Sequence, residues 1–576
     1  MKTMLKGIAA SDGVACGRVY RLDEPDLHVS QQTITDLDYE LNRFRQALEA
    51  TVSEIETIKT RVNKNLGADR AQVFIAQMAM LKDRDLIGNI EHQMQDRHVN
   101  AEFAVSLVSA TVEDELAALA DNPYLQERLT NWRAVAKRLT AHLLGVTLPD
   151  LALVSEPVIV VTHDLIASEA VAANPQQVLG FITDAGGRTS HSSILARSLN
   201  IPAVVGTQAA THELTNGELV VVNGTQGNVM VGPTTEEVAT ARQTMAQRVK
   251  NQRKLEKLKH FETVSRDGVG VTLAANMGTV ADLPRVVASG AEAIGLFRTE
   301  FLYLDAQHLP TEDEQFEIYR RVLEKMRPRP VVIRTLDVGG DKNLPYRTSQ
   351  SEANPFMGAR AIRQSLAHQQ VFRSQLRALI RASAFGQLKI MFPMIATLDE
   401  LRQAKAIYDD ERAKLTAKRV PMGEIAVGMM VEVPAAALLA DRFANEVDFM
   451  SIGTNDLIGY TLAADRTNQN VAYLYQPYHP AILRLIDRVI SAGHAAGIPV
   501  AMCGEMAGDP IALPLLLGMG LDEFSMAPGT ILKTRQLIRQ LDAHELASLA
   551  ETTVNSAGTS QEVITMVQAA VPNVLK

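Results

Sequence analysis

The segment PVVIRTLDVGG, residues 330–340, is a short apolar run that ends on an arginine and then enters a glycine turn. Its β-branched core is typical of a strand that is covered on both faces, as in a parallel sheet. Segments of the same kind recur after Thr263, separated by stretches with helical periodicity: VTLAANM, AIGLFRT, LKIMFPMI, IAVGMMVEVP, FMSIGTNDL and VAMCGEM. Strands that alternate with helices over this length predict a C-terminal (β/α)8 barrel of the TIM type.

Such a barrel needs one strand more than these segments supply. We expect the eighth strand near NPFMGARAIR, residues 354–363, in the long interval between PVVIRTLDVGG and LKIMFPMI. With this placement, the final strand of the barrel is VAMCGEM, which ends on Cys503.

Polar side chains stand where several of the predicted strands end: Arg298, Arg334, Glu432, Asn455, Asp456 and Cys503. Barrel enzymes place their chemistry at the C-terminal ends of the strands, so we expect these side chains to meet at one mouth. Each of them alone has an ordinary structural explanation, such as an ion pair between Arg298 and Glu300. Their shared position at successive strand ends favours a functional site.

The residue types at this mouth indicate which kind of ligand binds there. Arg298 and Arg334, together with Arg466 in the loop after FMSIGTNDL, offer planar guanidinium groups that suit carboxylate and phosphate. Glu432 and Asp456 offer hard oxygen ligands, which suit a Mg²⁺ ion that also binds substrate phosphate. The sequence therefore predicts a small, strongly anionic and phosphorylated substrate.

A second candidate site lies in GGRTSHSSILARSL, residues 186–199, where a glycine pair precedes a predicted helix that starts at His191. Free backbone N–H groups and the helix dipole at such a position favour an anion. Neutral imidazole is a competent nucleophile, so a phosphohistidine at His191 is chemically reasonable. A lone histidine beside a turn is more often structural, but the phosphate-binding barrel downstream favours the functional interpretation.

The first part of the chain contains two other kinds of residue pattern. Residues 36–145 have the apolar spacing of amphipathic helices and carry no cluster of catalytic residue types, which predicts a helical bundle. From Pro157 onward, short β-branched runs surround one helix and predict a small α/β module. The stretch 234–262 is polar on nearly every face, which is typical of a connecting helix that buries little.

Composition restricts the class of protein. The chain has 576 residues, 46% of them hydrophobic, and a net charge of −9, which argues against nucleic acid or an anionic membrane as the main partner. Cys16 and Cys503 make no disulfide framework and favour a reducing compartment. The first residues lack the apolar run of a signal peptide, and the apolar run Ile511–Leu521 is too short to span a bilayer. We expect a soluble cytoplasmic protein without membrane insertion.

Taken together, the motifs resemble one known family. GGRTSHSSILAR, GLFRTEFLY, RTLDVGGDKNLPY, NPFMGARAIR, GMMVEVPAA, SIGTNDL and MCGEMAGD are similar to Enzyme I of the bacterial sugar phosphotransferase system. The resemblance runs from GIAAS near Lys6 to LGMGLDEFSM, which ends at Met526. It implies a phosphoenolpyruvate-protein phosphotransferase, which takes the phosphoryl group of phosphoenolpyruvate onto a histidine and passes it to a histidine of the small carrier HPr.

The resemblance also implies roles for individual residues. His191 is the phospho-acceptor, Glu432 and Asp456 bind Mg²⁺, and Cys503 protonates the enolate to give pyruvate. The substrate is held by side chains at the barrel mouth, namely Arg298, Arg334, Arg360, Asn455, Asp456 and Arg466. Ala170 stands where some members have a threonine that can bond to the active histidine, so the orientation of the His191 ring is left open.

The domain organisation implied by the resemblance is a multidomain α/β architecture. A phosphohistidine swivel domain comprises residues 1–33 and 146–233, and a helical HPr-docking subdomain comprises residues 34–145. A linker helix, 234–262, leads to the phosphoenolpyruvate-binding barrel, 263–576, through which a homodimer forms. Asp69, Asp85 and Leu86 are the expected HPr contacts.

Two other interpretations compete with this one. Phosphoenolpyruvate synthase and pyruvate phosphate dikinase also pair a phosphohistidine domain with a barrel, but they need a nucleotide-grasp domain. The residues before Pro157 are too few and too helical for that domain, and no Walker-type glycine loop is present. A sensor that binds the ligand without catalysis is disfavoured by the complete set of reactive side chains.

Overall fold

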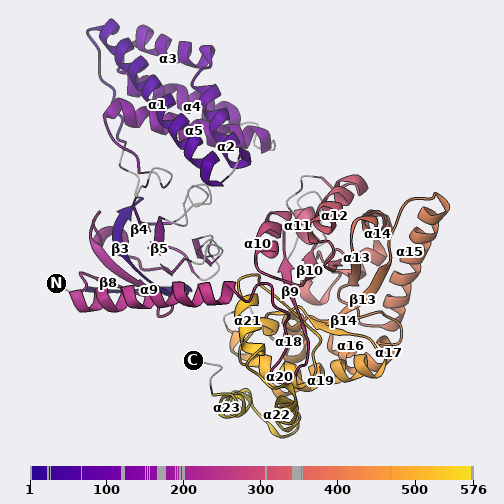
Figure 1. Cartoon of the computed structure of the whole chain (residues 1–576). Helices are drawn as coiled ribbons and strands as arrows, with labels where there is room; N and C mark the ends of the chain where they lie inside the picture. Colours follow the sequence, from indigo (N-terminus) through magenta and orange to yellow (C-terminus); the bar gives the residue numbers. More distant parts are fainter. Residues whose placement is uncertain are drawn as a thin grey trace. The chain divides into compact units, whose positions relative to one another are not determined.

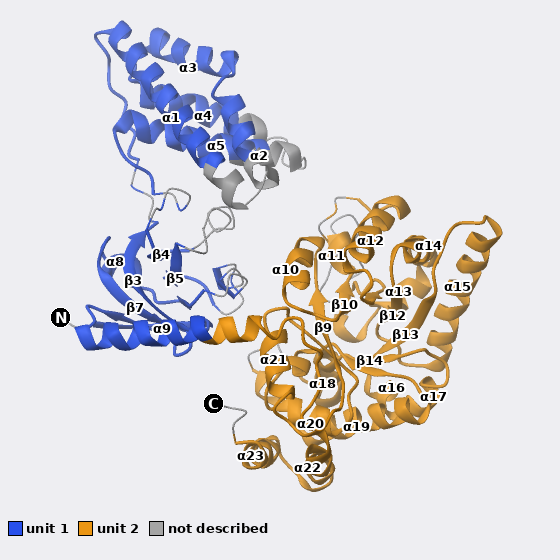
Figure 2. Cartoon of the chain, in the orientation of Figure 1, with its two compact units in different colours: residues 1–250 blue, residues 251–576 orange. Residues whose placement is uncertain are grey.

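A computed structural model describes most of the chain as two compact units, residues 1–250 and 251–576 (Figure 2). It describes residues 3–22, 25, 27–66, 68–117, 123–149, 151, 154, 156–164, 177–187, 190, 192–193, 196–197, 201–304, 306, 308–339, 352, 354–465, 468 and 470–572, without the side chains of 61–72, 114–127 and 130. Three residues singled out by the sequence, His191, Ala170 and Arg466, lie outside the described residues, as does the side chain of Asp69.

The helical part of the first unit follows the predicted amphipathic segments. Its helices are α1 (Leu37–Leu66), α2 (Ala68–Met80), α3 (Arg84–Arg97), α4 (Ala101–Ala117) and α5 (Pro123–Leu144). Their apolar faces meet in one core around Phe44, Ile55 and Trp132. Helix α3 begins where the Asp83 carboxylate accepts hydrogen bonds from the amides of Asp85 and Leu86, because an N-cap side chain satisfies the free N–H groups of a first turn.

The remainder of this unit is built on one mixed sheet. Its strands are β1 (Thr3–Lys6), β2 (Ile8–Ser11), β3 (Val14–Arg21), β4 (Val158–Thr162), β5 (Val178–Thr183), β6 (Ala203–Val205), β7 (Leu219–Asn223) and β8 (Asn228–Val231). They lie in the order β1-β8-β7-β3-β4-β5-β6-β2, so chain segments from either side of the helical part share the sheet. A short helix, α8 (Ala210–Glu213), follows β6.

Helix α9 (Thr235–Glu256) carries the polar stretch for which the sequence predicts little burial. The first half of this helix departs from that prediction, because Val238, Ala241 and Met245 pack over Cys16 on the sheet. The amide of Cys16 also donates to the sulfur of Met245, at 3.3 Å. The boundary between the two compact units falls inside this helix (Figure 2).

The second unit contains the predicted barrel. Its strands are β9 (Thr272–Met277), β10 (Ala293–Arg298), β11 (Val331–Arg334), β12 (Leu388–Phe392), β13 (Ile425–Val431), β14 (Met450–Ile452), β15 (Val500–Met502) and β16 (Glu523–Met526). Each strand pairs with the next in parallel, and β16 pairs with β9 to close the barrel. The (β/α)8 prediction is therefore confirmed.

One strand lies elsewhere than the sequence predicts. NPFMGARAIR contains a 3-10 turn, η3 (Pro355–Met357), and the start of a helix, and the eighth strand is β16. Cys503 therefore follows the penultimate strand, β15, and not the final one. The strand β16 escapes the pattern because it has no continuous apolar run: Phe524 packs toward the helices, whereas Ser525 bonds to Asn276 inside the barrel.

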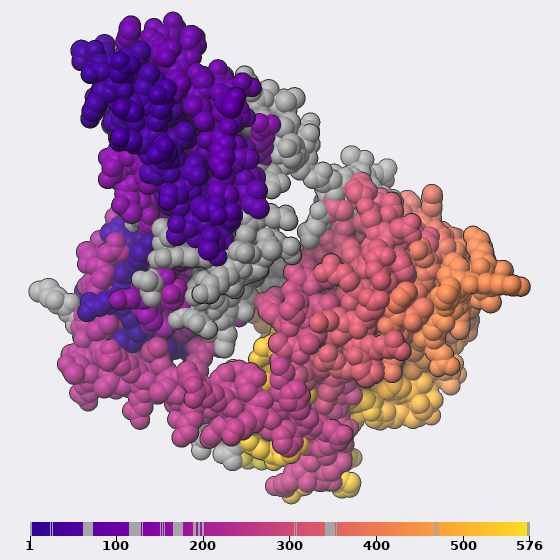
Figure 3. Space-filling model, turned by 45° about the horizontal axis from the view of Figure 1, so that its top comes forward, coloured from indigo at the N-terminus to yellow at the C-terminus, as the bar shows by residue number. Residues whose placement is uncertain are grey.

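The helices of this unit cover the outside of the barrel or, like α22 and α23, pack on the helices that do (Figure 1). They are α10 (Leu283–Ala288), α11 (Glu300–Leu304), α12 (Glu312–Met326), α13 (Ile362–Ala367), α14 (Gln369–Ala382), α15 (Leu398–Ala417), α16 (Pro434–Leu438), α17 (Ala440–Phe443), α18 (Thr454–Leu462), α19 (Pro480–Ala495), α20 (Ala512–Gly518), α21 (Ile531–Ile538), α22 (Ala543–Ser556) and α23 (Ser560–Ala570). The end of α15 projects from the surface of this unit (Figure 3).

The strands bury side chains on both of their faces. The inward side chains form a small cluster inside the barrel, made of Leu296, Val332, Met391, Met430, Phe449 and Cys503. The outward side chains join a much larger core beneath the helices. In the described part of the chain, no helix is both long enough and apolar enough to cross a membrane.

A fully buried arginine on α21 anchors the segment through which the chain enters the barrel. The Arg535 guanidinium donates to the carbonyl oxygens of Leu258, Lys259 and Gly290 at 2.8–3.1 Å. Its Nε donates to the Thr263 hydroxyl at 2.9 Å. Leu258 and Lys259 lie just after α9 and Gly290 just after α10, so one guanidinium ties both segments to α21.

Candidate active site

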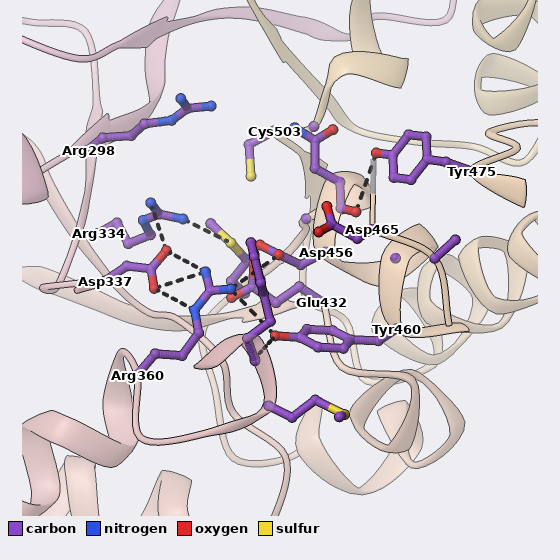
Figure 4. A pocket seen from close by; sticks show the side chains of 18 of the residues that line it. Arg298, Arg334, Asp337, Arg360, Glu432, Asp456, Tyr460, Asp465, Tyr475 and Cys503 are labelled. Atoms are coloured by element: carbon purple, nitrogen blue, oxygen red, sulfur yellow. Dashed lines mark hydrogen bonds and ion pairs between the residues drawn. The ribbon is translucent and has the colours of Figure 1, made fainter. Parts of the chain in front are cut away.

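A cavity of about 500 Å³ opens at the C-terminal ends of the barrel strands (Figure 4). Several of the side chains that line it lie at or directly after the ends of β10, β11, β13, β14 and β15, as the sequence predicts. The lining residues are Leu296, Arg298, Glu300, Arg334, Asp337, Asn354, Phe356, Met357, Arg360, Met430, Glu432, Gly453, Asn455, Asp456, Gly459, Tyr460, Ala463, Ala464, Asp465, Tyr475, Cys503 and Gly504.

Three arginines face this cavity. Arg298 and Arg334 are the last residues of β10 and β11, and Arg360 stands between η3 and α13. Arg298 forms no ion pair with any carboxylate among the described residues, and in Figure 4 its side chain enters the cavity away from the others. Its guanidinium is therefore available to an anionic ligand.

The other two arginines are buried and paired. Arg334 is 6% exposed and forms ion pairs with Glu300 and, at 3.1 Å, with Asp337. Burial opposes the charge of Arg334, but the carboxylates of Glu300 and Asp337 outweigh it and raise the pKa of the guanidinium. Arg360 is 4% exposed, and Asp337 and Asp456 raise its pKa against the effect of burial in the same way. Both arginines are firmly cationic.

Glu432 and Asp456 meet these arginines across the cavity. Glu432 follows β13, is 1% exposed and accepts a hydrogen bond from the Met394 amide at 2.6 Å. Burial, and then the negative charges of Asp456 and Asp337, raise the pKa of Glu432 to about 8. Asp456 lies in the first turn of α18, and its Oδ1 is 3.4 Å from Arg360 Nη1. The fold therefore holds carboxylates together where their mutual repulsion is not fully neutralised.

This crowding of carboxylates fits a bound cation. A divalent ion between Glu432 and Asp456 would remove the repulsion that raises the pKa of Glu432. In the described part of the chain, no group of three His, Cys, Asp or Glu side chains is arranged to hold a metal ion by itself. The two carboxylates therefore suit an ion such as Mg²⁺, which takes most of its ligands from water and substrate oxygens.

Cys503 lies at the floor of the cavity, directly after β15, and is 3% exposed. Burial raises the pKa of its thiol to about 11. The Cys503 carbonyl accepts a hydrogen bond from Asn276 at 3.0 Å, which fixes the backbone from inside the barrel. The next residue must be a glycine, because a Cβ on Gly504 would stand 1.8 Å from the Thr454 hydroxyl. The thiol is thus held protonated and in place.

Two tyrosines also line the cavity, although no sequence pattern predicts them there. Tyr460 Oη lies 3.4 Å from Arg360 Nη1 and donates to the Phe356 carbonyl at 2.5 Å. Tyr475 Oη donates to the carbonyl of Asn455 at 3.3 Å. Asn455 itself faces the cavity from the first turn of α18, as expected. The tyrosines come from a helix interior and a distant loop, where a side-chain direction is not readable from sequence.

Part of the loop before His191 is described. Asp184, at the end of β5, is buried and accepts hydrogen bonds from two threonine hydroxyls and two backbone amides, which fixes the start of this loop. Gly186 has a φ of +98°, a conformation that favours glycine. The Ser190 hydroxyl donates to the Gly187 carbonyl at 2.8 Å. The glycine turn thus forms, while His191 lies outside the described residues.

Three family models match this chain. The phosphoenolpyruvate-binding domain of phosphoenolpyruvate-utilising enzymes matches residues 252–543, which contain the cavity. The N-terminal domain of these enzymes matches residues 6–128, and their mobile domain matches residues 154–227. The fold and the cavity therefore define an enzyme of the phosphoenolpyruvate-utilising class.

Similar proteins narrow this class to one family. A solved structure of Enzyme I is 36% identical over 43% of this chain and 99% of that one, with a TM-score of 0.38. The phosphoenolpyruvate-protein phosphotransferase of Listeria innocua is 51% identical over 99% of both chains. That of Latilactobacillus sakei is 52% identical over 97% of this chain and 98% of its own. The identity and coverage of these two phosphotransferases show that the chain belongs to the phosphoenolpyruvate-protein phosphotransferase family.

Proposed function

We propose that this enzyme transfers the phosphoryl group of phosphoenolpyruvate to His191 and then to a histidine of HPr, releasing pyruvate as the first step of sugar uptake by the phosphotransferase system. The observation that carries the proposal is the cavity, in which three arginines lie together with Glu432 and Asp456 at the ends of the barrel strands. The full-length similarity to phosphoenolpyruvate-protein phosphotransferases supports it. The same full-length match disfavours a synthase or dikinase that has lost its nucleotide domain.

Substrate binding follows from the charges in the cavity. Arg298, which has no carboxylate partner among the described residues, supplies a free guanidinium for the phosphate or the carboxylate. Arg334 and Arg360 present further cationic edges, and Asn455 can add a neutral hydrogen bond. We assign Arg466 to the same task from its place in the loop after α18. The phosphoenolpyruvate anion would thereby be held at both of its charged ends.

We assign Mg²⁺ to Glu432 and Asp456. When bound, the ion would supply positive charge that offsets the phosphate oxygens during in-line transfer. Glu432 must be ionised to serve as a ligand, and with a pKa of about 8 this carboxyl group binds a proton at neutral pH when no metal ion opposes it. Metal affinity should therefore rise with pH between about 6 and 8, because the ion competes with a proton for Glu432.

The chemistry divides into two steps. In the first, the bond between phosphorus and the enol oxygen breaks as a bond from phosphorus to an imidazole nitrogen of His191 forms. In the second, the enolate left behind takes a proton on its methylene carbon and becomes pyruvate. We assign this proton to Cys503, whose thiol is protonated at neutral pH and faces the cavity. The resulting thiolate regains its proton from solvent.

The test is a labelling experiment with phosphoenolpyruvate that carries a radioactive phosphate, with Mg²⁺ and with or without purified HPr. We expect an acid-labile label on the enzyme, transfer of that label to HPr, and one pyruvate released for each phosphate transferred. The H191A variant should bind phosphoenolpyruvate in calorimetry but take up no label. The H212A variant, which changes an exposed histidine on α8, is the matched control and should label normally. Stoichiometric label on H191A, or none on the wild type, would contradict the proposal.

The proposal also assigns a function to each domain of the chain. We assign residues 1–33 and 146–233 to the phosphohistidine domain, 34–145 to HPr docking, 234–262 to the linker and 263–576 to the barrel. Asp85 and Leu86 lie at the start of α3, where Asp85 is exposed, and with Asp69 they form the proposed HPr contact. A D85K variant should raise the Kd for HPr while labelling from phosphoenolpyruvate stays normal.

We further propose a homodimer that forms through the barrel. Large apolar side chains are exposed on this unit at Leu438, Leu439, Tyr473 and Leu474, and exposed apolar side chains of this size are common in subunit interfaces. Sedimentation of the wild type should show a dimer, and replacing Leu438 and Leu439 with serine should shift it toward monomer. A monomeric wild type at micromolar concentration would contradict this part of the proposal.

A further inference from the structure

Asp337 is a cavity residue that the reaction described above does not use. It stands three residues after Arg334, in the turn that follows β11, and is 1% exposed. One Asp337 oxygen accepts from Arg360 Nε at 3.2 Å, and both oxygens accept from Arg360 Nη2 at 3.1 Å (Figure 4). The same carboxylate lies 3.1 Å from Arg334 Nη2. One buried carboxylate therefore contacts two of the three arginines in the cavity.

These contacts fix the direction in which Arg360 points. A carboxylate that faces Nε and Nη2 together sets the plane of a guanidinium, which a single contact leaves free to rotate. The remaining edge, at Nη1, is then turned toward Asp456 Oδ1 and Tyr460 Oη. Both of those contacts are 3.4 Å long, beyond the usual length of a hydrogen bond to nitrogen. The Nη1 edge is therefore oriented but only weakly engaged.

Two explanations of Asp337 give different expectations. If it only balances buried positive charge, any carboxylate that reaches this region would serve, and Glu300 already contacts Arg334. If it orients the guanidinium planes, the position of the carboxylate matters as much as its charge. The bonds to Arg360 favour orientation, because they occupy one whole edge of the guanidinium and leave the opposite edge facing the cavity.

We propose that Asp337 is a positioning residue for phosphoryl transfer, which holds Arg334 and Arg360 so that their free edges face the phosphoryl group as it moves. The inference rests on the proposed function and goes beyond it by assigning the residue that orients the arginines. Phosphoryl transfer depends on positioned charge more than on covalent chemistry, so a small misplacement of a guanidinium lowers the rate strongly.

The test uses two substitutions in the full-length enzyme. D337N keeps the size of the side chain but removes the charge, and D337E keeps the charge but moves it by one carbon–carbon bond. For both variants we expect the rate of single-turnover labelling from phosphoenolpyruvate to fall at least tenfold. The Kd of phosphoenolpyruvate, measured by calorimetry without divalent metal, should stay within about threefold of the wild type or decrease in D337N, because the cavity gains net positive charge.

The matched control is Glu411 on α15. It is also 1% exposed and contacts Arg373, Arg377 and Lys414 in the same unit, away from the cavity. E411Q removes a buried, paired carboxylate as D337N does, so it should lower the melting temperature but leave the labelling rate unchanged. If D337N fails to fold, D337E still tests the proposal.

Three results would overturn the inference. The first is a wild-type labelling rate in D337N, and the second is a normal rate in D337E with a reduced rate in D337N, which would show that only charge matters. The third is a loss of phosphoenolpyruvate affinity that fully accounts for the reduced rate. A wild-type enzyme that takes no label would instead overturn the proposed function, and the calorimetric Kd values would still report on the arginines.

Discussion

At the scale of single residues, the fold changes the protonation of Glu432. Burial and two neighbouring carboxylates raise its pKa from 4.5 to about 8. Between these values, the folded chain binds a proton that the unfolded chain has released. The free energy of unfolding must therefore fall as pH rises through this window, by up to about 1.4 kcal/mol for each pH unit.

The E432Q variant isolates this effect because an amide does not ionise. Without divalent metal, E432Q should gain stability relative to the wild type as pH rises from 5 to 8, measured by urea unfolding in a chelating buffer. E411Q should show no such trend over this range, because the ion partners of Glu411 outweigh its burial and lower its pKa, so that its contribution to stability is lost only at pH values below this range. Parallel pH profiles of E432Q and wild type would contradict the assignment.

Cys503 allows binding to be separated from protonation. C503A keeps the arginines and carboxylates, so the Kd of phosphoenolpyruvate should change little. Pyruvate formation should fall by roughly a hundredfold or more, because a positioned acid contributes that much to a proton transfer. In deuterated water, with phosphoenolpyruvate that carries one tritium stereospecifically on its methylene carbon, the new C–D bond should lose its facial selectivity. A normal rate with retained stereochemistry would contradict this assignment and indicate that Cys503 only packs in the core.

At the scale of secondary-structure elements, Arg535 joins α21 to the segment between α9 and β9. R535M should remove the Arg535 donors from three half-buried carbonyls and from the Thr263 hydroxyl, and we expect the barrel to lose about 3–5 kcal/mol of stability. The control is R402A, which removes an exposed pair with Glu446 and should change the stability far less, because solvent screens an exposed ion pair. Urea unfolding of both variants gives the comparison, and equal losses would contradict the anchoring role.

The elements also show what the sequence could and could not predict. Strands such as β11 and β13 were predictable because burial on both faces requires continuous apolar runs. The four-residue strand β16 was not, because its inward Ser525 bonds to Asn276 and interrupts the pattern. In NPFMGARAIR, apolar residues suggested a strand, but Phe356 and Met357 are exposed at the cavity.

The same reasoning applies to the cavity. Arg298, Arg334 and Glu432 could be placed there because the end of a barrel strand fixes where a side chain must lie. Asp337 stands only three residues beyond Arg334, yet nothing in the sequence shows that the turn folds back and brings its carboxylate between two arginines. Contacts of this kind depend on loop geometry, which local sequence does not determine.

At the scale of the whole molecule, the division into two compact units predicts that they act separately. A fragment comprising residues 1–259 keeps α9 and the whole mixed sheet. It should exchange phosphate with phosphorylated HPr but take no label from phosphoenolpyruvate, because it lacks the barrel cavity. The full-length chain assayed alongside is the positive control. A fragment that is labelled directly from phosphoenolpyruvate would place the donor site in the first unit.

The burial of both cysteines has a consequence for chemical attack on this enzyme. Thiol alkylation and oxidation proceed through the thiolate, and a pKa of about 11 leaves roughly one Cys503 thiol in a thousand ionised at pH 8. Cys16 is also buried with a raised pKa, beneath α9. The folded enzyme should therefore resist maleimides and peroxide, and a covalent inhibitor would need phosphate-like or carboxylate-like groups to carry its warhead into the cavity.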